Sequence, residues 1–204
     1  MKNRMIVVDV DDTLLHWKEA YLEWMKLKGW ETKPVGNNIT WEMSNWFLPQ
    51  KDTGYIMTPE ISLTYIKEFN SYPRVLRPLE GSYETLKFSA VDCGYEIVAL
   101  TSFSDHYSSI EFRQQYLDVV FKGLISKCIV LDLGACKKET LQELNPEIFI
   151  EDNASHAKKA IDLGIRTLLI STPYNQGVEE AYYFKDWKSL GEDILIEIGE
   201  RFYG

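Results

Sequence analysis

Apolar and polar positions follow two rhythms along most of the chain, and these predict short strands separated by helices. Apolar runs rich in Val, Ile and Leu predict buried strands at residues 5–8, 96–100, 128–131, 148–150 and 167–170. Helical spacing, with stop signals at Asn145-Pro146 and Gly164, predicts helices at residues 83–92, 108–118, 137–144, 154–163 and 189–202. Because this alternation is typical of parallel βαβ units, we predict an α/β fold: a Rossmann-like parallel sheet with helices on both faces.

The stretch from residue 15 to residue 77 interrupts this alternation. It contains two predicted helices, at 17–27 and 59–69, and no clear strand run. It also holds five of the six tryptophans, namely Trp17, Trp24, Trp30, Trp41 and Trp46. Because the stretch directly follows the first strand, we predict that 15–77 is a small helical cap, inserted into a core made of 1–14 and 78–204.

Composition narrows the class of protein. Of the 204 residues, 45% are hydrophobic and 26% are charged, which is ordinary for a soluble globular domain. The net charge of -9 argues against a broad surface for nucleic acid or membranes, because phosphate affinity requires clustered Lys and Arg. The three cysteines show no paired spacing, which argues against a disulfide scaffold or a zinc site and favours a cytoplasmic protein. We expect neither a signal peptide nor a membrane span, because the apolar runs are short.

The strongest chemical signal is the segment Asp9-Val10-Asp11-Asp12-Thr13, directly after the first apolar run. In open α/β sheets, ligands bind at the carboxyl ends of the strands. Two carboxylates as close as Asp9 and Asp11 repel each other unless a cation or a shared proton lies between them. The pattern therefore suits a metal-held carboxylate nucleophile with a second carboxylate as acid and base. The alternative is an ordinary turn followed by a helix cap.

Polar residues also end two other predicted strands. Thr101-Ser102 follows the second strand, Glu151-Asp152 follows the fourth, and Lys137-Lys138 opens the helix before the fourth. Carboxylates suit a hard cation, hydroxyl groups suit phosphate oxygens, and a lysine supplies a point charge. Each piece alone has an ordinary structural explanation, but the ordered set predicts phosphoryl transfer.

These motifs resemble those of the haloacid dehalogenase (HAD) superfamily of aspartate-nucleophile phosphohydrolases. Its first motif, a hydrophobic strand followed by DxDx(T/V), is matched by Asp9, Asp11 and Thr13. Its second motif, a strand ending in Thr or Ser, is matched by Thr101.

The later motifs of the family are a lysine, a helix and a strand that ends in an acidic pair. The chain matches them with Lys137, or alternatively Lys138, and with Glu151-Asp152. It departs from the family at His156, where many members carry another acid. A metal-shell carboxylate is therefore missing, or Glu151 serves instead.

The resemblance implies a mechanism and a Mg²⁺ cofactor. Asp9 attacks phosphorus to form an aspartyl-phosphate, and Asp11 protonates the leaving oxygen and then activates water. Lys137 neutralises charge on the phosphate and on Asp9. The implied metal ligands are Asp9, Asp11 through its backbone carbonyl, and Asp152, with Glu151 in or next to the shell. The implied phosphate-binding residues are Thr13, Thr101 and Ser102.

The cap sets the substrate in this superfamily, and here it is rich in aromatic residues. Trp17 and the segment from Ile39-Thr40-Trp41 to Trp46-Phe47 resemble aromatic positions of the 5'(3')-deoxyribonucleotidase branch (cytosolic type C). This resemblance predicts a 5'-nucleotidase that acts on (deoxy)nucleoside monophosphates, with Trp17, Trp46 or Phe47 stacked on the base.

The alternative is that these aromatic residues pack the cap helices. Trp17, Trp24 and Leu27 fall on one helical stripe, which more often forms a core than a ligand cage. The enzyme would then be a phosphatase of sugar phosphates or of other small phosphometabolites. Less favoured are a phosphotransferase and a non-catalytic phosphate-binding protein. The expected partner is a small phosphomonoester, with neither nucleic acid nor membrane involved; monomer and homodimer both stay open.

Overall fold

The computed structural model describes residues 3–34, 42–104 and 106–191, which are arranged around one six-stranded sheet. The strands are β1 (Asn3–Val8), β2 (Glu96–Ser102), β3 (Ile125–Leu131), β4 (Pro146–Glu151), β5 (Arg166–Ile170) and β6 (Tyr182–Phe184). They lie in the order β3-β2-β1-β4-β5-β6, and all neighbouring pairs are parallel. The predicted Rossmann-like α/β fold is therefore confirmed.

The helices of the described residues fall into two groups. Three lie between β1 and Arg77: α1 (Trp17–Leu27), the short 3-10 helix η1 (Met43–Trp46) and α2 (Pro59–Asn70). The others flank the sheet: α3 (Ser82–Lys87), which continues into the π-helix η2 (Phe88–Asp92), α4 (Tyr107–Val120), α5 (Lys138–Leu144) and α6 (Ala154–Asp162).

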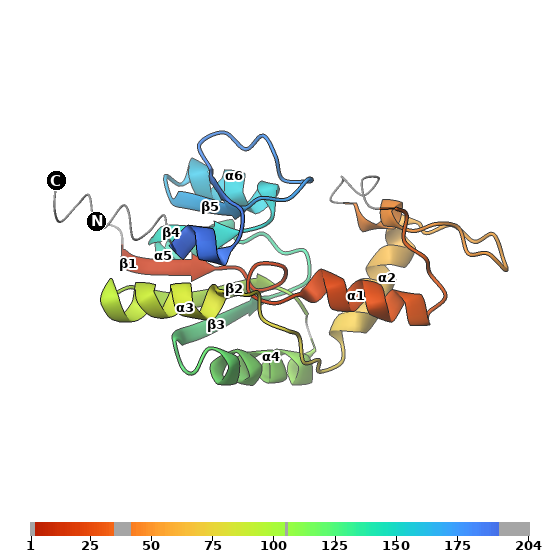
Figure 1. Cartoon of the computed structure of the whole chain (residues 1–204), viewed down its shortest axis with the longest axis horizontal. Coiled ribbons are helices and arrows are strands. Elements are labelled where there is room, and N and C mark those ends of the chain that lie inside the picture. Colours follow the sequence, from red (N-terminus) through yellow and green to blue (C-terminus); the bar gives the residue numbers. More distant parts are fainter. Residues whose placement is uncertain (1–2, 35–41, 105, 192–204) are drawn as a thin grey trace.

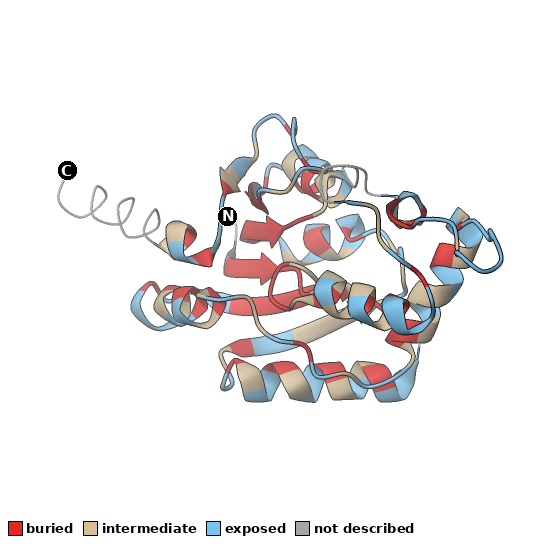
Figure 2. Ribbon diagram, turned by 45° about the vertical axis from the view of Figure 1, so that its right-hand side comes forward, coloured by how far each residue is buried: buried red, intermediate tan, exposed pale blue. Residues whose placement is uncertain are grey.

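Alternate positions of the strands build two cores, one on each face of the sheet. Ile6 of β1 packs in a buried cluster with residues of α3 and α4, whereas its neighbour Val7 packs with residues of α5 and α6. This alternation follows from the two-residue repeat of an extended chain. Figure 2 shows that the buried residues concentrate in the central strands. The helix members of the two clusters include Leu86 and Leu117 on the first face, and Leu141 and Ala160 on the second.

The helices α1 and α2 lie beyond the carboxyl ends of the strands rather than on a face of the sheet (Figure 1). They are held together by aromatic side chains. Tyr21 stacks on Trp17 with ring centroids 4.9 Å apart and meets Phe69 edge-on at 5.4 Å. The predicted apolar stripe of Trp17, Trp24 and Leu27 was wrong at Leu27, which is 86% exposed. After Trp17, the buried residues of α1 are Tyr21 and Met25.

Several element bounds differ from those that the sequence predicts. The helix expected at 83–92 is divided into α3 and η2, and the three-residue strand β6 was not predicted. The helix expected at 189–202 begins at Trp187, and its part beyond Gly191 lies outside the described residues, as does the segment Ile39-Thr40-Trp41.

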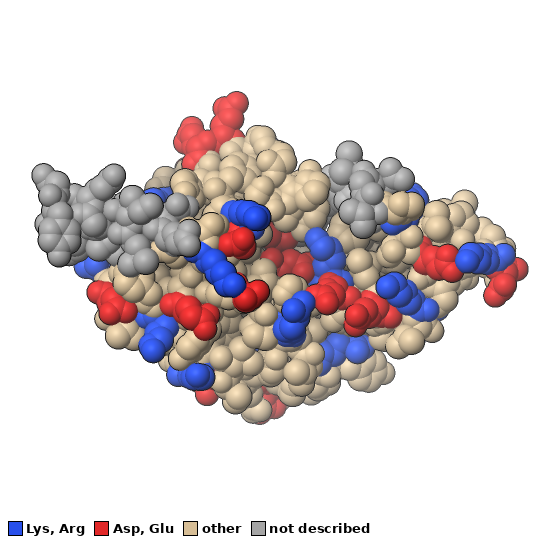
Figure 3. Space-filling view, viewed as in Figure 1, with Lys and Arg blue, Asp and Glu red and all other residues tan. Residues whose placement is uncertain are grey.

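Two observations concern the molecular surface. Acidic and basic side chains are interspersed over the face seen in Figure 3. Within the described ranges, no helix combines the length and the apolar character needed to cross a bilayer.

Candidate active site

The carboxyl end of β1 delivers Asp9 to the middle of the sheet. The backbone N–H of Asp9 donates to the carbonyl oxygen of Ile150 at 2.9 Å, which continues the pairing of β1 with β4 by one step. The Asp9 side chain is buried, with 5% of the residue exposed. The hydrophobic run of β1 thus anchors a carboxylate beside the end of β4, where Glu151 and Asp152 lie.

Lys137 lies between two of these carboxylates. Its Nζ atom donates to Asp9 Oδ1, and it lies 3.3 Å from Glu151 Oε2. Lys137 is 2% exposed, whereas Lys138 is exposed at the surface, so Lys137 is the lysine of the pair that enters the cluster. Burial alone would lower the pKa of Lys137, but the carboxylates of Asp9 and Glu151 outweigh it and raise the pKa above its ordinary value. The lysine is therefore held as a cation.

Asp9, Glu151 and Asp152 form a compact group of oxygen donors. Each offers a carboxylate oxygen, and these atoms all lie within 4.8 Å of one another. Burial and the neighbouring carboxylates raise the pKa of both Glu151 and Asp152 well above their ordinary values. Crowded carboxylates of this kind are stabilised by a hard divalent cation, which prefers oxygen ligands.

The charged groups around these three carboxylates are compatible with a bound divalent cation. The carboxylates that act on one another are those of Asp9, Asp11, Asp12, Glu151 and Asp152, and the cations that act on them are Lys18, Arg113 and Lys137. With all of these groups ionised, the described residues of the site carry five negative and three positive charges, an excess of two negative charges. One divalent cation such as Mg²⁺ fits both the donor set and this charge.

Glu151 differs from the other two carboxylates in what it contacts. Its Oε1 lies 2.7 Å from His156 Nδ1, and both of its oxygens lie within 3.4 Å of Lys137 Nζ. Burial lowers the pKa of His156 to about 4, so the imidazole is neutral at pH 7. His156 thus stands where the sequence pattern led us to expect an acid, and it contacts the carboxylate of Glu151.

Asp11 and Asp12, which follow β1 in the chain, accept hydrogen bonds from different partners. Asp11 Oδ1 accepts a hydrogen bond from Arg113 Nη1 at 2.5 Å. Burial raises the pKa of the Asp11 carboxyl, while Arg113 acts in the opposite direction. Asp12 adopts a positive φ of 61° and accepts a hydrogen bond from the backbone N–H of Lys18 at 2.8 Å. Asp12 therefore contacts the first turn of α1, whereas Asp11 faces Arg113 and Asp9 faces Lys137.

The predicted phosphate-binding residues lie at the same edge of the sheet. Thr101 is 1% exposed at the end of β2. Ser102 donates its hydroxyl to the carbonyl oxygen of Asp132 at 2.6 Å. Thr13 is fully buried, and its Oγ1 has no hydrogen-bond partner within the described part of the chain.

The three aromatic residues predicted to stack on a base are all buried. Trp17 is 8% exposed, Trp46 4% and Phe47 4%. The indole N–H of Trp17 donates to Asn70 Oδ1 at 2.9 Å, and Tyr21 covers one face of its ring. This geometry favours the packing alternative for Trp17.

Sequence reasoning missed the contact between α1 and the loop after β5. Lys18 Nζ donates to the Tyr174 hydroxyl at 2.8 Å and lies 5.2 Å from the centre of the Trp46 ring. Tyr174 in turn donates to Asp152 Oδ2 at 3.3 Å, and Asn175 donates to the Asp152 carbonyl at 2.8 Å. The Pro-Tyr-Asn turn was visible in the sequence, but nothing there showed that it meets Lys18.

Arg113 is a further residue of the site that the sequence motifs do not include. It is 3% exposed on α4 and pairs with Asp11. A signal was present: Ser109, Arg113 and Leu117 are spaced four apart and are the buried residues of α4. An arginine on a buried helical stripe usually has a specific anionic partner.

The comparisons with known proteins concern the fold. No protein-family model matches the sequence, and no curated protein matches it either. Among solved structures, a CbbY variant from Rhodobacter sphaeroides in complex with xylulose-(1,5)bisphosphate is 14% identical, with a TM-score of 0.57 over 94% of this chain and 97% of that one. A HAD family hydrolase from Deinococcus radiodurans R1 with bound phosphate and sodium is 13% identical, with a TM-score of 0.56 over 98% and 96%.

A third neighbour is YfnB from Bacillus subtilis, bound to magnesium. It is 13% identical, with a TM-score of 0.55 over 95% of this chain and 99% of that one. At this level of identity the likeness concerns architecture, and it extends over almost the whole length of both chains. The chain therefore has the fold of the HAD hydrolases.

Proposed function

We propose that this protein is a Mg²⁺-dependent phosphomonoester hydrolase that works through an aspartyl-phosphate on Asp9. The observation that carries the proposal is the buried Asp9 carboxylate, which contacts the Lys137 ammonium and lies within 4.8 Å of Asp152. A nucleophile, a fixed cation and a donor set for a divalent metal thus lie together at the carboxyl edge of a parallel sheet. The fold shared with HAD hydrolases supports the same conclusion.

The chain's own residues divide the chemistry as follows. Asp9 attacks phosphorus, and the ester P–O bond breaks as the Asp9–phosphorus bond forms. Asp11 gives a proton to the departing oxygen and later takes one from the water that cleaves the intermediate. Lys137 supplies a fixed positive charge beside Asp9, where negative charge must be stabilised in the transition state. Thr101 and Ser102 are proposed to hold phosphate oxygens.

Asp9 and Asp152 are the proposed carboxylate ligands of Mg²⁺, together with the backbone carbonyl of Asp11. When bound, the ion neutralises phosphate charge and orients it for in-line attack. Because both oxygens of Glu151 lie near Lys137 and one also contacts His156, we propose that Glu151 chiefly anchors the lysine beside the metal.

For the substrate, we propose a small phosphometabolite such as a sugar phosphate. The helices of segment 15–77 stand beyond the strand ends and are proposed to cap the site (Figure 1). Trp17, Trp46 and Phe47 are each 8% exposed or less, which disfavours an open slot for a planar base. The neighbour CbbY was crystallised with a sugar bisphosphate, which is compatible with this class.

A nucleoside monophosphate is the second candidate. One observation favours it: the rings of Trp46 and Tyr174 lie 6.3 Å apart at the border between the inserted helices and the core, beside Lys18. A base could stack there if it displaced the Lys18 ammonium, which lies 4.5 Å from the centre of the Tyr174 ring and 5.2 Å from that of Trp46.

Phosphate release decides between these substrates. The assay uses sugar phosphates, nucleoside 5'- and 3'-monophosphates and p-nitrophenyl phosphate, with Mg²⁺ or with EDTA, and Asp9→Asn as the control. We expect metal-dependent, Asp9-dependent release that is fastest with sugar phosphates. Activity concentrated on nucleotides would support the same mechanism but identify a nucleoside monophosphate as the substrate. No release from any ester would contradict the proposed function.

A further inference from the structure

The buried Arg113 raises a question that the reaction alone does not answer. Its guanidinium donates to Asp11 Oδ1 at 2.5 Å, and 4% of its side chain is exposed. A buried ion pair is rarely more stable than well-packed apolar side chains of the same volume. A buried arginine with an acidic partner therefore points to a role that needs its charge or its shape.

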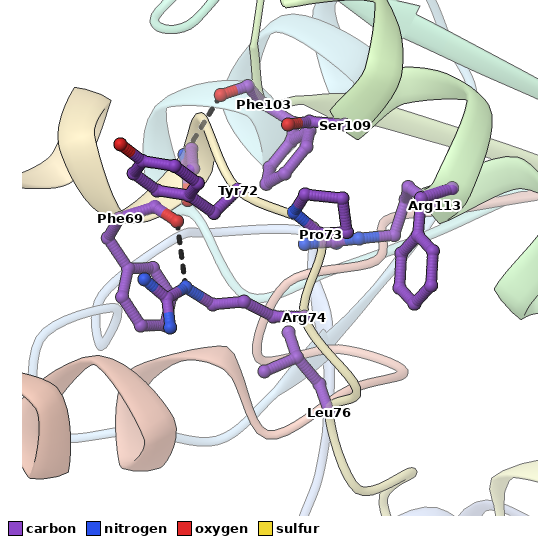
Figure 4. A pocket seen from close by; sticks show the side chains of 10 residues that line it. Phe69, Tyr72, Pro73, Arg74, Leu76, Phe103, Ser109 and Arg113 are labelled. Atoms are coloured by element: carbon purple, nitrogen blue, oxygen red, sulfur yellow. Dashed lines mark hydrogen bonds between the residues drawn. The ribbon is translucent and has the colours of Figure 1, made fainter.

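The guanidinium of Arg113 lies against an aromatic ring whose backbone is itself held in place. The ring of Phe103, the residue that follows β2, lies 4.0 Å from Arg113 Cζ. The backbone carbonyl of Phe103 accepts a hydrogen bond from Asn70 Nδ2 at 2.9 Å, and Asn70 Oδ1 accepts one from the Trp17 indole at 2.9 Å. Figure 4 shows the side chain of Arg113 extending from α4 past Pro73, in a small pocket that Phe69 and Phe103 also line. The guanidinium thus packs against Phe103, and Asn70 ties the backbone of Phe103 to α2.

The contact with Asp11 uses one carboxylate oxygen. Oδ1 accepts from Arg113, so we assign proton transfer to Oδ2. A planar guanidinium, which cannot lose its proton and does not rotate as an ammonium does, holds the oxygen that it contacts in a more defined direction than a lysine would.

We propose that Arg113 is a positioning residue that orients Asp11 as the acid and base of the reaction. This inference rests on the proposed function. In the first step the Asp11 proton passes to the leaving oxygen as the ester bond breaks and the Asp9–phosphorus bond forms. In the second step a water oxygen attacks phosphorus, the bond to Asp9 breaks, and the water proton returns to Asp11. Arg113 takes no part in bond making; it fixes the carboxyl group that moves the proton.

The leaving group provides the test. An alkyl phosphate needs a proton on its departing oxygen, whereas p-nitrophenolate leaves without one. Because kcat/KM covers steps up to release of the first product, it isolates the half-reaction in which the acid acts. Arg113→Gln should lower kcat/KM for an alkyl phosphate by about 10²-fold, and for p-nitrophenyl phosphate by less than about threefold. Arg113→Lys should restore part of the loss.

The ratio of the two kcat/KM values does not depend on how much of the variant is folded, so partial unfolding does not obscure the result. Arg74→Gln is the matched control, because Arg74 lines the same pocket but donates to the Phe69 carbonyl. It should leave the ratio unchanged. In the background of Asp11→Asn, Arg113→Gln should have no further effect on the ratio.

Equal losses on both substrates, or a further change of the ratio in the Asp11→Asn background, would overturn the positioning role while the proposed function stands. A wild-type protein that is inactive on both esters with Mg²⁺ would overturn the proposed function, and the inference with it.

Discussion

At the scale of single residues, Lys137 shows how the site depends on charge balance. Its ammonium contacts Asp9 and Glu151 in a place where only 2% of the lysine is exposed. Removing one partner of a buried ion pair leaves the other charges without compensation. Lys137 is therefore expected to matter both for folding and for chemistry.

Lys137→Met should lower the free energy of unfolding by about 3 kcal/mol, because two buried carboxylates lose their cation. It should also lower kcat by about 10²-fold or more, because a fixed charge beside the transferred phosphate is gone. Urea unfolding and phosphate release measure the two effects. Lys138→Met is the control, since Lys138 is exposed; equal behaviour of the two variants would refute the assignment.

Trp17 is the residue for which packing and ligand stacking predict different outcomes. If it packs, Trp17→Phe loses the hydrogen bond to Asn70 and the unfolding free energy falls by about 1–2 kcal/mol. The KM values for nucleotides and for sugar phosphates should then change by the same factor. A KM that rises for nucleotides alone would show that the indole contacts a base.

At the scale of elements, the sequence predicted the long, strongly patterned parts best. The strands β1, β2 and β4 and the helices α1 and α2 lie close to their expected bounds, because their apolar spacing is regular. The three-residue strand β6 was missed because it is too short to carry a pattern. The switch from α3 to η2 was missed because both forms of helix use similar residues.

The candidate site, too, could be predicted from the sequence only in part. The strand ends that carry Asp9, Thr101 and Asp152 could be predicted, because topology alone brings the carboxyl ends of parallel strands together. The contacts of Arg113 with Asp11 and of Lys18 with Tyr174 could not, because they join residues 102 and 156 positions apart. Pairings of that kind depend on side-chain directions that no local pattern contains.

Gly81, which precedes α3, is expected to be a sensitive position. It has a φ of +85°, and an added Cβ would lie 3.0 Å from Lys188 Cγ and 3.2 Å from the Lys188 backbone nitrogen. Gly81→Ala should lower the unfolding free energy by about 2 kcal/mol or more, from left-handed strain and crowding together. Gly94→Ala is the matched control: its φ is +69° but nothing lies within 4 Å, so about 1 kcal/mol is expected. Equal losses in urea unfolding would show that crowding against Lys188 is absent.

At the scale of the whole molecule, the excess of carboxylates in the site makes the stability of the protein depend on pH and on metal binding. Burial raises the pKa of Asp12 from 3.8 to about 7. A group with a raised folded-state pKa stabilises the protein below its unfolded pKa, and this stabilisation is lost as the pH rises through the folded pKa. The metal-free protein should therefore lose this contribution between about pH 4 and pH 7, and a bound divalent cation should replace it.

The difference in Tm between Mg²⁺-loaded and metal-free protein should accordingly grow as the pH is raised from about 5 to about 8. Protons and Mg²⁺ compete for the same crowded carboxylates, so metal binding is weak at the lower pH. His156, whose folded-state pKa is lowered from 6.5 to about 4, has the opposite effect on stability, which rises as the pH is raised between these two values. In the Asp152→Asn variant, the difference in Tm between Mg²⁺-loaded and metal-free protein should no longer increase with pH. A difference that is independent of pH would contradict the link.

The distribution of tryptophan gives the molecule a built-in optical label. Five of the six indoles belong to the segment 15–77, and the sixth, Trp187, is buried in the core, where it donates to the Thr13 carbonyl at 2.7 Å. Replacing Trp187 with Phe would leave an emission spectrum that comes from the inserted segment alone. Stopped-flow fluorescence could then report, with no dye attached, whether the surroundings of these indoles change when a ligand binds.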